Sequence, residues 1–204
     1  HLWQLETLGI PVASDLEGTL WIHPDAEKNL RERLLDTGLQ RDSSFILMSP
    51  GSKSDLKRWN ASSYAAVSDR LYQDKKIPVV LVGEKNDQPF TDAISASAHR
   101  PLYSLVGQTS IPEWVVMVRD AALLITNDNA ALHIASLLGT PTVAIFGPTD
   151  PRKYGPRAPK HRVVRRDLFC APCEKPRCPY HHECMEQLPV EEVYQACVDL
   201  LSPL

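Results

Sequence analysis

The stretch LLITNDNAALHIASLLGTPTVAIFGPTDPRKYGP, residues 123–156, decides the fold of this chain. Its pattern predicts a strand over Leu123–Thr126, a helix over Leu132–Leu138, and a strand over Thr142–Phe146 that runs into a proline-rich loop. The turn after the first strand gathers polar side chains, namely Thr126, Asn127, Asp128, Asn129 and His133. In open α/β sheets, ligands bind at the carboxyl ends of strands, where helix N-termini favour anions. The stretch therefore predicts a parallel sheet and a phosphate-bearing ligand.

The same alternation of strands and helices continues on both sides of this stretch. Further strands are expected over Leu20–His23, Phe45–Ser49, Pro78–Val82, Leu102–Leu105 and Arg162–Arg165. Helices are expected over Pro24–Leu35, Ala61–Tyr72 with Asn60 as its cap, Gln88–Ala98, a segment from the cap Ser110 to Arg119, and Val190–Leu201. Such alternation implies right-handed crossovers between parallel strands. The predicted fold class is α/β, with a Rossmann-like parallel sheet flanked by helices.

Composition narrows the class of protein. The chain has 204 residues, enough for one substantial α/β domain, and 43% of them are hydrophobic, which argues against disorder. With 22 basic and 25 acidic side chains, its formal net charge is −3, so it lacks the basic excess typical of nucleic-acid binding. No apolar run reaches the roughly 18–20 residues of a membrane-spanning helix. We therefore expect a globular protein with no nucleic-acid partner.

Residues 49–59 form a polar loop between a predicted strand and a predicted helix. Gly51 is expected to let a ligand approach the backbone, while Ser52, Lys53 and Lys57 offer hydrogen-bond donors and positive charge suited to a phosphate. The alternative is a solvated loop without a ligand. The loop matches neither a Walker A sequence nor GxGxxG, so no standard motif decides between the two.

Two more polar loops follow predicted strands. In the first, Glu84 or Asp87 could accept hydrogen bonds from ribose hydroxyls, or alternatively cap the next helix. In the second, Asp128 is expected to cap the helix so that the backbone N–H groups of residues 129–131 face a pyrophosphate, with His133 as a further donor. A packed structural histidine is the alternative for His133. Because the three loops should converge at one edge of the sheet, their joint presence favours a binding site.

The last quarter of the chain contains a cluster of cysteines. Cys170, Cys173, Cys178 and Cys184 lie close together in sequence, with His181 and His182 between them. The first pair has the spacing of a zinc site, and dense thiolates also hold iron–sulfur clusters. A structural metal is thus one prediction, while local disulfides and packed free thiols remain alternatives. Cys197 is expected in the core, and no cysteine is predicted to be catalytic.

Taken together and in this order, the motifs resemble the C-terminal half of glycosyltransferase family 9, the ADP-heptose:lipopolysaccharide heptosyltransferases. The resemblance covers nearly the whole chain. The motifs that carry it are Pro50-Gly51 followed by Lys57-Arg58-Trp59, then Val79–Gly83, Leu105–Ser110, Asn127-Asp128 followed by His133-Ile134-Ala135, Leu138–Pro141 and Phe146–Pro151.

The resemblance implies a GT-B fold, in which an N-terminal domain binds the acceptor and a Rossmann-like C-terminal domain binds the nucleotide-sugar donor. Segment 1–22 would then be a tail from the acceptor domain. Residues 23–204 would form the donor-binding domain, including a proline- and cysteine-rich loop over 150–189 and a closing helix over 190–201. The expected reaction is inverting transfer of heptose from ADP-heptose to the lipopolysaccharide inner core, without a required metal.

The resemblance also assigns roles to individual residues. Ser52, Lys53 and Lys57 would contact the donor phosphates, and Glu84 or Asp87 would lie near the ribose or adenine. The pyrophosphate and sugar site would consist of Asp128, Asn129, Ala130, Ala131 and His133. Lys57 and His133 would support departure of the nucleotide, whereas the catalytic base would belong to the acceptor domain. The implied location is the cytoplasm, with peripheral association at the inner face of the inner membrane as an option.

One departure from the family pattern bears on activity. The family usually has Asp-Ser/Thr-Gly where this chain has Asp128-Asn129-Ala130. Ala130 adds a Cβ where glycine would let a phosphate approach, and alanine disfavours a positive φ. Two alternatives to a working transferase follow. One is a catalytically degenerate nucleotide-sugar-binding module, and the other is a metal-binding or redox domain built on the cysteines.

Overall fold

A six-stranded parallel sheet forms the centre of the structure, a computed structural model that describes residues 22, 24–40 and 43–201. Its strands are β1 (Ile46–Ser49), β2 (Val79–Leu81), β3 (Leu102–Ser104), β4 (Leu123–Asn127), β5 (Thr142–Ile145) and β6 (His161–Val164). They lie in the order β3-β2-β1-β4-β5-β6. The chain thus builds outward from β1 on one side and then crosses to the other side at β4. Ser49 at the end of β1 pairs in register with Thr126 of β4.

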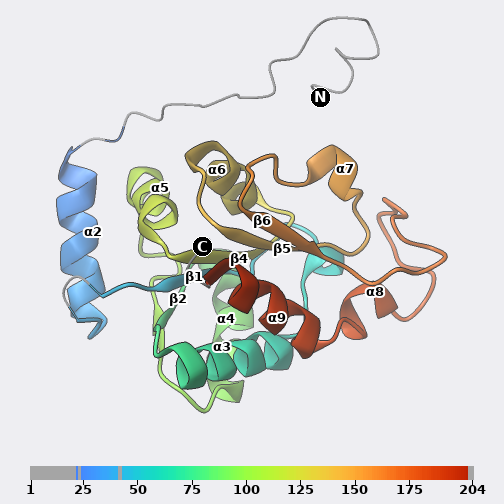
Figure 1. Ribbon diagram of the computed structural model, residues 1–204, viewed down its shortest axis with the longest axis horizontal. Coiled ribbons are helices and arrows are strands. Elements are labelled where there is room, and N and C mark those ends of the chain that lie inside the picture. The colour runs from blue at the N-terminus through green and yellow to red at the C-terminus, as the bar shows by residue number, and fades with distance from the viewer. Residues whose placement is uncertain (1–21, 23, 41–42, 202–204) are drawn as a thin grey trace, which may run out of the picture.

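Helices cover both faces of this sheet (Figure 1). One face is covered by α3 (Ala61–Lys75), α4 (Gln88–Ser97) and α9 (Val190–Leu201), and the other by α2 (Pro24–Asp36), α5 (Ile111–Asp120) and α6 (Ala130–Leu138). The alternation of side chains along β1 explains the two cores, because Ile46 and Met48 face the first layer while Leu47 faces the second. All three are fully buried.

Short elements lie in the connections. They are the 3₁₀ turns η1 (Asp55–Lys57) and η2 (Lys85–Asp87) and the single-turn helices α7 (Pro151–Tyr154) and α8 (Glu183–Glu186). Residues 165–182 contain no helix or strand. This segment is nevertheless fastened to the sheet, since the N–H groups of Cys173 and Glu174 both donate to the Pro148 carbonyl, at 3.0 and 2.8 Å.

The elements predicted from the sequence agree with those of the structure to within a few residues. Ser110 caps α5 as predicted, accepting from the Glu113 N–H while the Glu113 carboxylate accepts from the Ser110 N–H. Asn60 occupies the N-cap position of α3 as predicted, but its side chain makes no cap bond and turns instead toward the Glu186 carbonyl. The expected strand at Leu20–His23 and the tail 1–22 fall, apart from residue 22, outside the described residues.

Among the helices of the described residues, none has the length and apolarity needed to span a membrane.

Candidate functional site

The loops that follow β1 and β4 meet where the strand order reverses, and hydrogen bonds join them. The Thr126 hydroxyl donates to the Ser49 carbonyl at 3.1 Å, and the Asn127 amide donates to the Pro50 carbonyl. The buried Tyr64 hydroxyl of α3 donates in turn to the Asn127 side-chain oxygen. In doubly wound sheets this crevice is where ligands bind. These hydrogen bonds hold the β1 and β4 loops, which form the two walls of the crevice, at a fixed distance from each other.

An ion pair spans the crevice. Lys57 Nζ lies 2.7 Å from Asp128 Oδ2, with 30% of the lysine side chain and 7% of the aspartate side chain exposed. An ammonium group has three donors, so Lys57 keeps hydrogen-bonding capacity toward the open side. The prediction that Asp128 caps α6 is wrong, because its carboxylate faces Lys57 instead. The pair therefore presents a partly exposed positive charge at the site where the sequence predicted a phosphate contact.

Asn129 is the residue that caps α6. Its side-chain oxygen accepts from the Ala131 N–H at 2.9 Å and lies 2.9 Å from the Thr126 hydroxyl, whose single proton is shared between this oxygen and the Ser49 carbonyl. Its amide nitrogen donates to the Ser49 and Gly51 carbonyls at 3.1 and 2.9 Å. The residue thus completes the helix terminus and also ties β4 to the β1 loop. A serine or threonine hydroxyl has one proton to donate and could not reproduce this whole set.

The first turn of α6 leaves two of the predicted residues at the surface. Ala130 and His133 are exposed, whereas Ala131 is fully buried and its N–H is occupied by Asn129. Ala130 does not have a positive φ; in the described chain the non-glycine residues that do are Lys76, Glu174 and His182. The predicted backbone strain at Ala130 is therefore wrong. The effect of alanine here is limited to the space its Cβ occupies.

The two acidic candidates in the loop after β2 differ in solvent exposure and in hydrogen bonding. Glu84 is exposed, while Asp87 is 9% exposed and accepts from the Glu84 N–H at 3.0 Å and from Arg58 Nη2 at 3.1 Å. A Cβ built on Gly51 would lie 2.3 Å from an Asp87 carboxylate oxygen. The Asp87 side chain thus leaves no room for a Cβ at Gly51, whereas the approach of a ligand to Gly51 stays a prediction. Of the two carboxylates, Glu84 is the one that solvent reaches.

Arg58 organises the β1 loop, and the sequence reasoning assigned it no role. Its guanidinium makes ion pairs with Asp55 at 2.8 Å and Asp87 at 3.1 Å, and it donates to the Ser52 carbonyl at 2.8 Å. Ser52 is half-buried, and its hydroxyl accepts from the Ser54 N–H at 3.4 Å. Lys53 is exposed. The only signal in the sequence for Arg58 was its place beside Lys57 in the quoted family motif.

The four clustered cysteines line a cavity formed by the 165–182 segment and α8, with Leu56 of η1 and Pro148 completing its walls. All five cysteines are free thiols in the structure, which is one of the alternatives expected from the sequence. Burial, reinforced by the nearby Cys173, Cys178 and Cys170, raises the pKa of Cys184 to about 11. Cys197 is fully buried in α9, as expected, and burial raises its pKa as well. Both thiols are therefore protonated at neutral pH, which agrees with the prediction that neither is a nucleophile.

The strand order, with polar loops at its switch point, defines the class of doubly wound, Rossmann-like α/β domains. Within that class, the profile described as glycosyltransferase family 9 (heptosyltransferase) matches residues 17–183, and the chain belongs to this family. The family and the Rossmann-like fold predicted from the sequence are thereby confirmed.

Individual relatives agree. The chain is 29% identical over 170 residues to lipooligosaccharide heptosyltransferase 2 of Campylobacter jejuni, a match that covers 81% of this chain and 54% of that protein. A family 9 glycosyltransferase from Veillonella parvula superposes with a TM-score of 0.83 at 24% identity, over 97% of this chain and 57% of that one. The Escherichia coli ADP-heptose lipopolysaccharide heptosyltransferase II superposes with a TM-score of 0.74 at 23% identity, over 90% of this chain and 53% of that one. The chain thus spans about half the length of these proteins.

Proposed function

We propose that this chain supplies the donor-binding half of a heptosyltransferase that takes heptose from ADP-heptose and adds it to the lipopolysaccharide inner core. The observation that carries the proposal is the Lys57–Asp128 pair at 2.7 Å, which joins the β1 and β4 loops at the switch point of the sheet. Family membership over residues 17–183 supplies the reaction class. The acceptor-binding domain and the catalytic base would be contributed by a preceding domain, to which segment 1–22 would connect, while residues 23–204 form the donor domain.

On this proposal, Lys57 and His133 contact the diphosphate together with backbone N–H groups at the start of α6. Ser52 and Lys53 approach the same phosphates from the β1 loop. Glu84, which is exposed, accepts hydrogen bonds from the ribose, whereas Asp87 supports the loop through Arg58. Asn129 and Ala130 shape the wall nearest the sugar, and Ala131 holds the helix terminus through its bond to Asn129.

The proposed chemistry is electrostatic. The acceptor hydroxyl attacks the anomeric carbon from the face opposite the nucleotide, its proton passes to the base of the acceptor domain, and the carbon–oxygen bond to ADP breaks with inversion. The electron pair remains on the departing β-phosphate oxygen. Lys57, His133 and the helix N–H groups stabilise that developing negative charge. No metal is required at this site. The reaction would take place in the cytoplasm, at the inner face of the membrane where the acceptor is built.

Titration of the chain with ADP tests the proposal, with binding measured by calorimetry. We expect saturable binding that weakens at least tenfold in Lys57→Ala, because the substitution removes the cation that faces the diphosphate. Lys75→Ala is the matched control, since Lys75 is an exposed lysine in the last turn of α3. Absence of binding at millimolar ADP in the unsubstituted chain would contradict the proposal. Binding without any transfer by the full-length protein would instead identify the degenerate module.

A further inference from the structure

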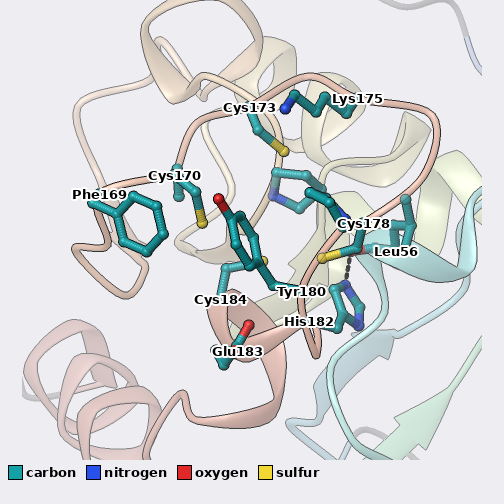
Figure 2. Close-up of a pocket in the computed structure, with 13 residues that line it drawn as sticks. Leu56, Phe169, Cys170, Cys173, Lys175, Cys178, Tyr180, His182, Glu183 and Cys184 are labelled. Atoms are coloured by element: carbon teal, nitrogen blue, oxygen red, sulfur yellow. Dashed lines mark hydrogen bonds between the residues drawn. The ribbon is translucent and has the colours of Figure 1, made fainter.

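Four cysteines line a single cavity at the end of β5, and Leu56 of η1 contributes to the same walls. The cavity has a volume of about 260 Å³, and its walls include Cys170, Cys173, Cys178 and Cys184. In Figure 2 the sulfur atoms of Cys170, Cys173 and Cys178 turn toward the same interior region, above Cys184. The segment between the first and last of these residues spans only 15 positions of the chain, yet it contributes four soft ligands to one space.

We propose that these four thiols form a structural site for one metal ion that prefers tetrahedral thiolate ligands, of zinc or iron chemistry. Cys170 and Cys173 have the CxxC spacing of such sites, and Cys178 and Cys184 complete a set of four. A fourfold thiolate set leaves no open position, so the ion holds structure and takes no part in chemistry. Each thiol loses its proton to solvent on binding, and no electron is transferred.

The ion requires the sulfur atoms to draw together. In the described part of the chain, no group of three or more His, Cys, Asp or Glu side chains is already arranged to hold a metal ion. Metal–sulfur bonds of about 2.3 Å bring the sulfurs to about 3.8 Å from one another. The segment that must adjust, residues 165–182, contains no helix or strand, so side-chain rotation and small backbone shifts can close the set. Lys175 lines the same cavity and offsets part of the negative charge of four thiolates, while Glu183 in the same lining adds one negative charge.

Two of the four ligands already have fixed positions. Cys184 lies in α8, where its sulfur would be only 3.2 Å from a Cβ at Gly147, so it packs directly on the end of β5. The N–H of Cys173 donates to the Pro148 carbonyl at 3.0 Å. Further contacts of the segment are the Lys153–Glu174 ion pair at 2.7 Å and the packing of Leu168 and Ala171 on the core. An ion would connect Cys170 and Cys178 to Cys173 and Cys184, whose positions the sheet already fixes.

Metal analysis of protein purified without chelator tests the proposal. We expect about one equivalent of zinc or iron per chain, and the element detected distinguishes the two ions. The metal content should fall at least tenfold in Cys173→Ser and in Cys184→Ser. Cys197→Ala is the matched control and should keep the ion, because that cysteine is buried in α9 and is absent from the cavity lining.

A second measurement separates loss of the site from loss of the fold. The unsubstituted chain, stripped of metal and titrated with zinc chloride, should bind one equivalent at micromolar concentration, and X-ray absorption should give sulfur neighbours at about 2.3 Å. Failure to bind zinc, or a shell of nitrogen and oxygen neighbours alone, would overturn the proposal. So would mass spectrometry that finds the four cysteines paired as disulfides in freshly purified protein. None of these measurements depends on nucleotide binding.

Discussion

At the scale of single residues, Asn129 stands where the family pattern has serine or threonine, and its side chain does two things. Its oxygen closes the N-terminus of α6, and its amide binds carbonyls at the end of β1. With asparagine in place of serine or threonine, the side chain therefore makes hydrogen bonds to the β1 loop in addition to the helix cap. Ala130 is exposed and has no positive φ, so its difference from the glycine of the family pattern is a Cβ that faces outward.

Substitution of Asn129 should expose both of its functions. Asn129→Ala removes the cap and the amide donor to the Gly51 carbonyl, and leaves only the Thr126 hydroxyl to serve the Ser49 carbonyl, so we expect a loss of about 2–3 kcal/mol in unfolding free energy. Asn129→Ser restores only the cap and should recover about 1 kcal/mol of that loss. Urea unfolding measures both, with Asn86→Ala in the exposed part of η2 as the control. If Asn129→Ser were as stable as the unsubstituted chain, the bonds to β1 would contribute nothing.

At the scale of elements, the start of α5 is joined to α2. The buried Glu113 carboxylate accepts from the Ser110 N–H at 2.6 Å, from the Ser110 hydroxyl at 2.7 Å and from Arg33 of α2 at 2.9 Å. Burial alone would raise the pKa of Glu113, but the hydrogen bonds from Ser110 and Arg33 outweigh it, and the pKa lies below its ordinary value of 4.5. The carboxylate thus stabilises the folded state in its charged form.

This arrangement gives a stability that depends on pH. Because the folded-state pKa is lowered, the stabilising contribution is fully present above pH 4.5 and disappears as the pH falls through the folded-state value. Glu113→Gln should therefore cost about 1–3 kcal/mol at neutral pH, and the difference from the unsubstituted chain should shrink in more acidic solution. Denaturant unfolding at several pH values measures this, with the exposed Glu32→Gln as control. A difference that stays constant across the range would contradict the assignment.

At the scale of the whole molecule, α9 closes the fold by packing against α3 and against β4, β5 and β6. It places Val193 and Cys197, both fully buried, in the same core as residues of β1 and β2. The last helix of the chain thus shares a core with strands on both sides of the switch point.

Unfolding should consequently be a single transition in which α9 takes part. Val193→Ala opens space in this core and should lower the unfolding free energy by about 1–3 kcal/mol. Circular dichroism and loss of ADP binding should follow the same denaturation curve in both proteins. The exposed Gln195→Ala is the control on the same helix. Separate transitions for the two signals would show that α9 is an independent unit.

The sequence was sufficient for the elements but not for the contacts between loops. Continuous apolar runs and glycine or proline boundaries predict strands such as β4 and β5 because those features are local. The role of Asp87 was not predictable in this way, since it depends on Arg58, which lies 29 residues away, and on the missing Cβ of Gly51. Asp128 likewise has a cation 71 residues away as its partner, which no local pattern reveals. Long-range polar pairing is therefore where sequence reasoning failed.

The β1–α3 loop depends on residues that follow much later in the chain. Its Trp59 indole donates to the Leu188 carbonyl at 3.2 Å across 129 positions, and the His182 ring bonds the Leu56 carbonyl. On a ribosome that adds about 5–20 residues per second, Leu188 appears roughly 6–26 s after Trp59. The nascent chain therefore carries the loop for that interval without these partners. The bonds that fix this loop can therefore form only after 129 further residues have been made.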